Sequence, residues 1–219
     1  MATRAVLAEL TAAYNARSGV SVAIDSVGGV DAAKRVAAGE AFDVVLLASD
    51  AIDKLIAAGH LQSGSRVDLL RSPVAVAVRA GAFRPNIGSE AAVRSAVLAA
   101  RTLGYSTGPS GTFLIQLFER WGIAEQIAPR TVVPPPGVPV GSLLAKGEID
   151  LAFQQVSELQ GLAGVDVIGL LPAEIAYITT FSAGLPKGSM RPDAVHALLA
   201  YLTSTETAAT KRKHGMEPA

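Results

Sequence analysis

Three turns rich in Gly, Ser or Pro could bind an anion without any charged side chain. They are Ser26-Val27-Gly28-Gly29, Thr107-Gly108-Pro109-Ser110-Gly111 and Pro136-Gly137-Val138. Each precedes a predicted helix, so it presents free backbone N–H groups and the positive end of a helix dipole. For any single turn the alternative is that Gly and Ser only satisfy the turn geometry. Three such turns in one chain favour an anion site.

Side chains near these turns offer further contacts for an anion. Arg4, Lys34 and Arg35 lie near the starts of the first two predicted helices, where they could pair with a carboxylate or simply cover an exposed helix face. Gln154 and Gln155 follow a predicted strand, so we expect at least one of these amides to point out of the sheet end with a donor and an acceptor. A polar cap on the following helix is the alternative.

A serine nucleophile is a competing interpretation of one turn. Gly104-Tyr105-Ser106-Thr107-Gly108 matches the G-x-S-x-G elbow of serine hydrolases and lies between a predicted strand and a predicted helix. The remaining triad members would be Asp150 or Asp166 with His196. His196 falls inside a predicted helix rather than on a loop after a strand, so a hydrolase is the least favoured function. The turn also lacks the Lys of a phosphate-binding P-loop, which disfavours nucleotide hydrolysis.

The charge balance excludes nucleic acid as the main partner. The chain has 219 residues with 19 Lys and Arg against 19 Asp and Glu, so the formal net charge is zero. Affinity for nucleic acid depends on clustered Lys and Arg that neutralise phosphates. The only dense basic run is Lys211-Arg212-Lys213-His214, which we interpret as a solvated helix terminus.

The remaining composition narrows the class further. Half of the residues are hydrophobic, which excludes disorder, and no apolar run approaches the roughly 18 residues that cross a bilayer. The chain has no cysteine and three scattered histidines. Disulfides, thiolate chemistry and a histidine metal site are therefore not expected. We expect no cofactor, no membrane insertion and a monomer.

The elements that must position these turns alternate along the chain. Amphipathic periodicity predicts a helix that starts almost at residue 1 and includes Tyr14, and Pro192 precedes two closing helices. Strand-to-helix alternation with short Gly-containing connections is typical of an α/β fold with a mostly parallel sheet. The other predicted helices are 30–38, a helix that passes through 55 and stops at 59, 90–100, 111–121 and 138–146. The predicted strands are 20–24, 43–47, 67–70, 74–78, 102–105, 131–133, 150–153, 165–171 and 177–183.

Four segments in one collinear order carry a family resemblance. Arg35-Val36-Ala37-Ala38-Gly39-Glu40-Ala41-Phe42-Asp43-Val44-Val45 resembles "Q-I-x-x-G-A-P-x-D-V-F" of molybdate-type periplasmic binding proteins, the solute receptors of ABC transporters. Gly147-Glu148-Ile149-Asp150-Leu151-Ala152-Phe153 resembles "G-E-A-D-x-G-F" of the same family. Gly108-Pro109-Ser110-Gly111 lies where these proteins have "V-P-A-G", and Tyr201-Leu202-Thr203-Ser204 is similar to "F-L-x-S". The resemblance covers nearly the whole chain.

The resemblance implies a two-lobed α/β fold of the type II periplasmic binding proteins, with a ligand cleft between the lobes. The first lobe would comprise residues 1–78 plus 174–219, and the second residues 79–173. The hinge would pass near Val78-Arg79 and Glu174-Ile175, and closure around a ligand would be the expected motion. The family also begins with a strand that has no counterpart here, so either the start of the chain is too late or the strand is absent.

Departures from the family argue against molybdate. The resemblance places Ala2 and Val30 where two serines hold the oxyanion, and Gln155 where a Tyr reaches it. Loss of these hydroxyls removes charge-assisted hydrogen bonds worth about 1.5–3 kcal/mol each. We therefore expect a different small anion, an organic acid. The candidate ligand-binding residues are Thr3, Arg4, Gly28, Gly29, Val30, Ser110, Gly111, Gly137, Val138 and Gln155.

Two functions from different classes follow. The favoured one is a solute-binding receptor without catalytic residues, with an ABC-transporter permease as its expected partner. It would be periplasmic if an upstream signal peptide is missing from this chain, and cytoplasmic otherwise. The alternative is an allylic isomerase of an unsaturated tricarboxylic acid such as aconitate, because some proteins that resemble this family have that activity. This reaction needs a general base, and Glu158 is the nearest carboxylate, with a surface or helix-capping role as the alternative.

Overall fold

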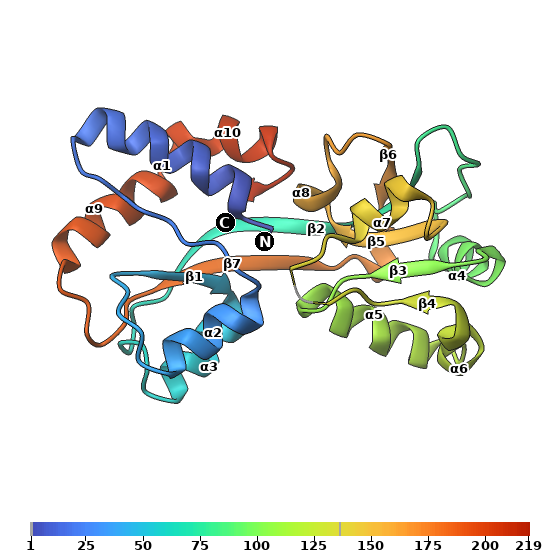
Figure 1. Ribbon diagram of the computed structural model, residues 1–219, viewed down its shortest axis with the longest axis horizontal. Helices are drawn as coiled ribbons and strands as arrows, with labels where there is room; N and C mark the ends of the chain where they lie inside the picture. The colour runs from blue at the N-terminus through green and yellow to red at the C-terminus, as the bar shows by residue number, and fades with distance from the viewer. Residues whose placement is uncertain (1, 136) are drawn as a thin grey trace. The chain divides into compact units, whose positions relative to one another are not determined.

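The chain folds into two compact α/β units, as its pattern predicts. The computed structural model describes residues 2–135 and 137–219 (Figure 1). Unit 1 comprises the chain up to Ser72 together with Thr180–Ala219, and unit 2 comprises Pro73–Thr179. Two long strands, β2 (Val67–Arg79) and β7 (Ile178–Gly184), run from one unit into the other.

The unit boundaries differ by six residues at each crossing from those predicted from the sequence. Residues 73–78 and 174–179 group with unit 2 instead of unit 1. Within β2, Val74–Val78 pair with strand β5 (Leu151–Gln155) of unit 2. Ile175 is also buried in the hydrophobic core of unit 2. Ladder pairing and burial therefore assign both segments to unit 2.

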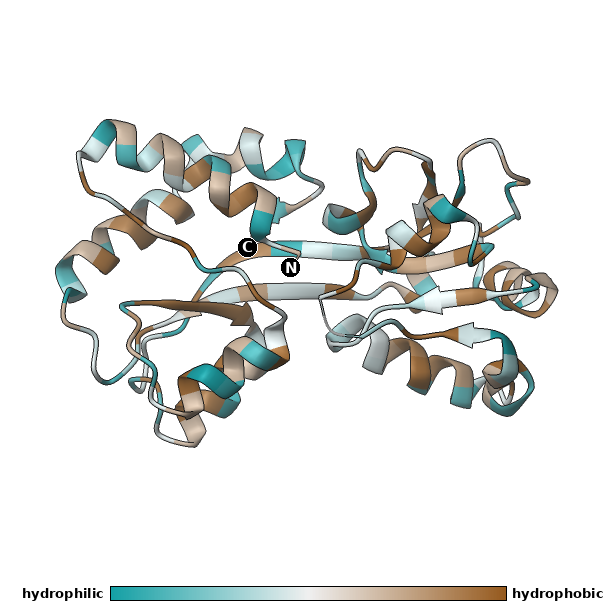
Figure 2. Ribbon diagram, viewed as in Figure 1, coloured by the Kyte–Doolittle hydropathy of each residue, from teal (hydrophilic) through white to brown (hydrophobic). Residues whose placement is uncertain are grey.

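Unit 1 has a strand layer covered by helices on both faces. One face packs Val6 and Leu10 of the first helix with Leu198 near the C-terminus, and the other packs Val36 with Ile52. Strand β1, hydrophobic along its length in Figure 2, pairs antiparallel with β7. The elements of unit 1 besides β2 and β7 are α1 (Arg4–Ser18), α2 (Gly29–Ala37), β1 (Val45–Ala48), α3 (Ser49–Ala57), α9 (Pro192–Thr203), η3 (Thr205–Thr207), α10 (Ala208–Lys213) and β8 (Glu217–Pro218).

Unit 2 has the strand order β6-β2-β5-β3-β4. One face packs Phe153 against Leu114 and Phe118, and the other packs Ala152 against Leu144 and its neighbours. The elements of unit 2 besides β2 are α4 (Glu90–Ala99), β3 (Leu103–Tyr105), α5 (Pro109–Arg120), α6 (Ala124–Ile127), η1 (Ala128–Arg130), β4 (Thr131–Val132), α7 (Val140–Lys146), β5, α8 (Val156–Leu159), β6 (Val165–Leu170) and η2 (Ala173–Ile175).

The prediction of a mostly parallel sheet is wrong, because most of the strand pairs are antiparallel. Strand β3 runs parallel to β4 and β5, but β2 runs antiparallel to β5, β6 and β8, and β1 runs antiparallel to β7. The reason is that β2 enters the strand layer of unit 2 against the direction of β3, β4 and β5, and β7 enters that of unit 1 against the direction of β1.

The predicted strand at residues 20–24 is also wrong. This segment is extended but pairs with no strand in the described parts of the chain. The side chain of Asn15 bonds both the N–H and the carbonyl of Val22, at 3.0 and 3.3 Å. Val20 and Ile24 stay exposed. Alternating apolar residues give a strand only where a neighbouring strand completes the ladder.

The basic run near the C-terminus is not fully solvated. Lys211 has 1% of its surface exposed, and its ammonium donates to the carbonyls of Leu69 and Leu202 at 3.0 and 2.6 Å. Lys213 does lie at the surface, where it pairs with Glu9 of α1. The run therefore attaches α10 to the rest of unit 1 and is only partly a solvated terminus.

Candidate functional site

In unit 2, the ends of two parallel strands bring the start of α5 and the residue Gln155 to one edge of the sheet. Tyr105 of β3 pairs with Phe153 of β5, so Gln155, two residues further on, stands level with Thr107 in the loop that leads to α5. Alternation along β5 places Gln155 on the same face as Phe153, which is the face that α5 covers (Figure 1). Gln154 points to the opposite face.

The sequence around the start of α5 leaves backbone donors available. Gly108 adopts φ 106°, a conformation that favours glycine. The first helical bond runs from the Thr112 N–H to the Gly108 carbonyl at 2.9 Å, so the N–H groups of Ser110 and Gly111 precede the helical ladder. In the described residues, no side chain caps this terminus and the first turn has no acidic residue. The arrangement suits an anion.

Gly111 is required by a close backbone approach. A Cβ at this position would lie 2.0 Å from the Ser106 carbonyl oxygen. Ser110 is buried beside it, with 3% of its surface exposed. The candidate residues Ser110 and Gly111 thus lie at a tightly packed junction between β3 and α5.

Gln155 has one polar atom with a partner and one without. Its side chain is 4% exposed, and its Nε2 lies 2.5 Å from the Thr179 hydroxyl oxygen. Its Oε1 is buried and has no hydrogen-bond partner within the part of the chain that the structure describes. A buried, unsatisfied amide oxygen costs about 1–3 kcal/mol, which is unusual in a native structure outside functional sites.

Gln154 and Glu158 form a second polar group at the same end of β5. The Gln154 side chain is buried, its Oε1 accepts from the Gly141 N–H at 3.4 Å, and its amide hydrogen-bonds the Glu158 carboxylate. Burial raises the pKa of Glu158 above its ordinary value, and the Gln154 hydrogen bond opposes that rise. Glu158 is therefore a carboxylate with increased proton affinity, held in place by a buried amide.

In unit 1, the candidate residues lie at the starts of α1 and α2. Thr3 precedes α1, and Arg4 is its first residue; no side chain caps this terminus within the described chain, and Arg4 is exposed. Gly28 precedes α2, and Gly29 and Val30 begin it, with Val30 48% exposed. The first turn of α2 contains an acidic residue, so α2 is less suited to an anion than α1.

The structure removes Arg35 as a ligand contact. Its guanidinium bonds the carboxylates of Asp25 and Glu40 at 2.6 and 2.5 Å. Lys34, the residue of α2 before Arg35, is exposed. The two residues therefore cover a helix surface, the alternative interpretation of their spacing.

The third predicted turn is a weak candidate for an anion contact. Gly137 and Val138 are exposed in the loop before α7, and the Val138 N–H already donates to the Pro135 carbonyl at 3.1 Å. Gly137 has φ 87°, which accounts for its residue type. Pro136 of the same turn lies outside the described residues.

The residues of the predicted hydrolase triad are engaged elsewhere. Asp150 and Asp166 form ion pairs with Arg101 and Arg84. His196 is exposed on α9 and belongs to the other unit from the G-x-S-x-G turn.

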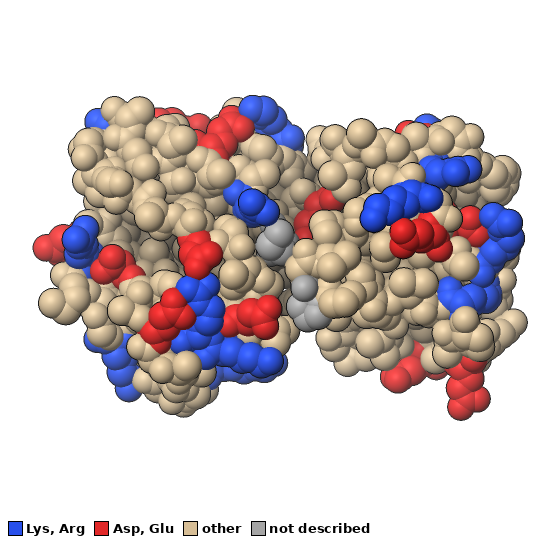
Figure 3. Space-filling view, viewed as in Figure 1, with Lys and Arg blue, Asp and Glu red and all other residues tan. Residues whose placement is uncertain are grey.

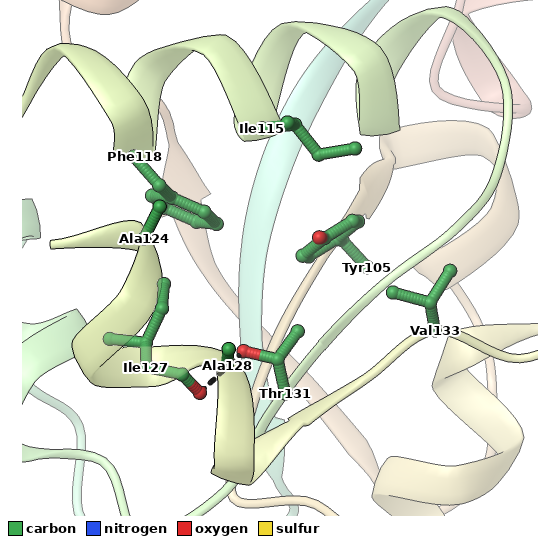
Figure 4. A pocket seen from close by; sticks show the side chains of 8 residues that line it. All are labelled: Tyr105, Ile115, Phe118, Ala124, Ile127, Ala128, Thr131 and Val133. Carbon is green, nitrogen blue, oxygen red and sulfur yellow. Dashed lines mark hydrogen bonds between the residues drawn. The ribbon is translucent and has the colours of Figure 1, made fainter.

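A separate pocket in unit 2 is apolar. It has a volume of about 270 Å³ and is lined by residues of β3, α5, α6 and the β4 region, among them Tyr105, Ile115 and Val133 (Figure 4). The hydroxyl of Thr131, at its edge, donates to the Ile127 carbonyl at 2.9 Å. Its lining has no charged residue, so it does not suit an anion.

The distribution of charges gives no second candidate. On the face that Figure 3 shows, Lys and Arg are mixed with Asp and Glu over both units. In the described ranges, His, Asp and Glu do not gather in a group that could hold a metal ion. None of the helices in those ranges has the length and apolarity that a membrane span requires.

Thr179, the partner of Gln155, was not predicted from the sequence, because it lies in no motif that could have identified it.

Comparisons with known proteins agree with this fold. A family model for "Bacterial extracellular solute-binding protein" matches residues 1–217. An aconitate isomerase from Pseudomonas sp. is 37% identical over 216 residues, covering 96% of this chain and 82% of that protein.

Solved structures show the same architecture. The periplasmic molybdate-binding protein of Azotobacter vinelandii superposes with a TM-score of 0.80 at 18% identity, over 98% of this chain and 94% of its own. The periplasmic binding protein AgtB of A. tumefaciens R10, in complex with agropinic acid, gives a TM-score of 0.76 at 14% identity, over 100% and 80%. The predicted periplasmic-binding-protein fold and family resemblance are confirmed, and the chain belongs to the bacterial extracellular solute-binding protein family.

Proposed function

We propose that this protein binds a small polycarboxylate. The observation that carries the proposal is the buried Gln155 amide with an unsatisfied atom, level with the loop before the uncapped start of α5. The Ser110 and Gly111 N–H groups donate to one carboxylate there, and Gln155 contributes a side-chain contact. Taken by itself, unit 1 offers the start of α1, with Thr3 and Arg4, as its candidate anion contact.

An organic acid fits these groups better than a tetrahedral oxyanion. Ala2 and Val30 have no hydroxyl to offer where molybdate receptors are expected to use serine. Gly28 and Gly29 contribute backbone donors only, and Val138 has its N–H engaged. The 37% identical relative is named for aconitate, a tricarboxylate, which supports the same ligand class.

A thermal-shift panel tests the ligand class. Molybdate, tungstate, sulfate, phosphate, citrate and aconitate are each added to the full chain at matched ionic strength. A ligand at about 100 times its Kd adds about 2.7 kcal/mol to the free energy of unfolding. We expect citrate or aconitate to raise the melting temperature and molybdate to leave it unchanged. A response to molybdate alone contradicts the proposal.

A second function is isomerisation of aconitate, and Glu158 is the observation that favours it. The reaction moves one proton: a base removes it from the CH₂ carbon next to the double bond, the double bond shifts, and the proton returns at the other end of the allylic system. A base whose pKa lies closer to neutrality performs both transfers best. The pKa of Glu158 is raised by burial, and Gln154 holds its carboxylate.

Following aconitate by absorbance separates receptor from isomerase. If Glu158 is the base, Glu158→Gln lowers kcat by about 10²- to 10⁴-fold. Binding of aconitate should persist in this variant. Glu125→Gln, at an exposed position of the same unit, is the matched control. A wild-type chain that binds aconitate without converting it is a receptor. Turnover that survives Glu158→Gln rules out Glu158 as the base.

The family membership supports a proposal for the cellular role. Export from the cytoplasm and delivery of ligand to an ABC-transporter permease are what we propose for the receptor function. Both are tested by locating the native protein in cell fractions and by co-purification with membrane components. Neither is needed for the isomerase function.

A further inference from the structure

The hydrogen bond between Gln155 and Thr179 determines what the Gln155 amide can offer a ligand. The nitrogen and oxygen of a glutamine amide occupy nearly equivalent positions, so their assignment depends on the surrounding hydrogen bonds. As assigned, Nε2 faces the Thr179 hydroxyl oxygen at 2.5 Å and Oε1 has no described partner. Exchanging the two atoms would leave the nitrogen available instead.

The contact between Gln155 and Thr179 can be made in either orientation of the amide. An N–H···O hydrogen bond normally spans 2.7–3.2 Å, whereas an O–H···O hydrogen bond spans 2.5–3.0 Å. The separation of 2.5 Å between Gln155 and Thr179 lies in the second range, but Lys211 Nζ and the Leu202 carbonyl oxygen, an N–H···O pair, are only 2.6 Å apart, so the distance is compatible with either orientation. A threonine hydroxyl can donate as well as accept, so Thr179 is able to serve the amide oxygen.

Burial makes the orientation of the amide matter for binding. Gln155 is 4% exposed and Thr179 is also 4% exposed, so neither side chain can rely on bulk water. In the exchanged orientation Nε2 takes the buried position that Oε1 has now, where the described residues offer it no partner. A carboxylate at pH 7 is an acceptor only, so it is the natural partner for the N–H groups of Nε2.

We propose that Gln155 and Thr179 form a carboxylate-recognition pair, in which the Thr179 hydroxyl donates to the Gln155 amide oxygen and so directs the amide N–H group toward a ligand carboxylate. Gln155 is then the residue that selects an acceptor, and Thr179 is a positioning residue. The inference rests on the proposed polycarboxylate function and extends it to the specificity of the site.

Tricarballylate is the probe that tests the pair. It carries three carboxylates and no hydroxyl or amine, so at pH 7.5 it presents only acceptors. Calorimetric titration is carried out on the full chain and on four variants, Gln155→Glu, Thr179→Val, Thr179→Ser and Thr180→Val. Thr180→Val is the control at the neighbouring position of β7.

The expected losses of affinity follow from the strength of one hydrogen bond to a charged ligand. Loss of such a bond lowers affinity about 10- to 100-fold. Gln155→Glu, which replaces the donor with a repelling acceptor, should lower affinity at least about 100-fold. Thr179→Val should lower it about 10-fold, because the amide loses the group that orients it. Thr179→Ser retains the hydroxyl and should restore wild-type affinity, as should Thr180→Val. Circular dichroism verifies that each variant folds.

Two results would overturn the pair. If Gln155→Glu binds tricarballylate as tightly as the wild type, Gln155 is not a donor to the ligand. If Thr179→Val and Thr179→Ser lose affinity equally, the hydroxyl is not what positions the amide.

The orientation itself can be measured without a ligand. Neutron diffraction from deuterium-exchanged crystals should place a deuteron on the Thr179 oxygen, directed at the Gln155 oxygen. Amide deuterons directed at Thr179 would refute the pair. This result is independent of the ligand class: failure of the wild-type chain to bind any polycarboxylate overturns the proposed function, while the neutron map still decides the orientation.

Discussion

Gly111→Ala should destabilise unit 2 by overpacking the junction between β3 and α5. The new Cβ would lie 2.0 Å from the Ser106 carbonyl oxygen and 3.1 Å from its carbonyl carbon, and real Cβ contacts below 3.0 Å essentially do not occur. Both groups belong to the backbone, so the turn and the helix start must separate by about 1 Å. Overpacking of this kind costs about 1–3 kcal/mol.

Differential scanning calorimetry measures the effect. For a chain of this size about 1 kcal/mol shifts the melting temperature by about 2–4 °C, so Gly111→Ala should melt about 2–12 °C below the wild type. Gly29→Ala is the matched control in the first turn of α2, where the nearest atom to the added Cβ is the Leu47 Cδ2 at 3.9 Å. It should be neutral or stabilise by up to about 1 kcal/mol. Equal melting temperatures for the two variants would refute the reasoning.

Three further predictions concern stability. Ser89 accepts from the N–H of the third residue of α4, at 3.2 Å, so Ser89→Ala should cost about 1 kcal/mol, read as a lower urea midpoint. Hydrogen bonding to Lys213, and then to His214, lowers the pKa of Glu9 below its ordinary value of 4.5. The ionised Glu9 carboxylate therefore stabilises the folded chain above pH 4.5, and this stabilisation is lost as the pH falls through the lowered pKa. Glu9→Gln should flatten the acid side of a plot of melting temperature against pH. Burial lowers the pKa of Lys211 below its ordinary value of 10.5, so at alkaline pH the unfolded chain binds more protons than the folded chain. The free energy of unfolding should therefore rise as the pH approaches 10.5. Lys211→Met should abolish that rise in urea titrations from pH 8 to 10.5.

Local patterns predicted the longer helices and most strands, because their signals are contained within a few residues; the four-residue helices α6 and α8 were not predicted. The prediction failed at residues 20–24, where alternation was correct but a partner strand was needed. It also failed to see that residues 67–70 and 74–78 belong to one strand that continues through Ser72 and Pro73. Pairing across the sheet decides both cases, and no short segment contains that information.

In the candidate site, too, local features were predicted from the sequence and contacts between distant segments were not. Gly and Pro at the start of α5 indicate a strand-to-helix turn, and the amide pair that ends β5 was expected at the end of the sheet. The engagement of Arg35 by Asp25 and Glu40 depends on how a loop returns to α2. Thr179 meets Gln155 across 24 residues of sequence, which only the folded chain brings together.

Binding of a polycarboxylate in preference to molybdate is tested most directly by a calorimetric titration of the wild-type chain with trans-aconitate and, separately, with molybdate. We predict saturable binding of trans-aconitate and at least about 100-fold weaker binding of molybdate, since two lost charge-assisted hydrogen bonds are worth more than that ratio. Tight binding of molybdate with no heat from trans-aconitate or any other polycarboxylate would contradict it.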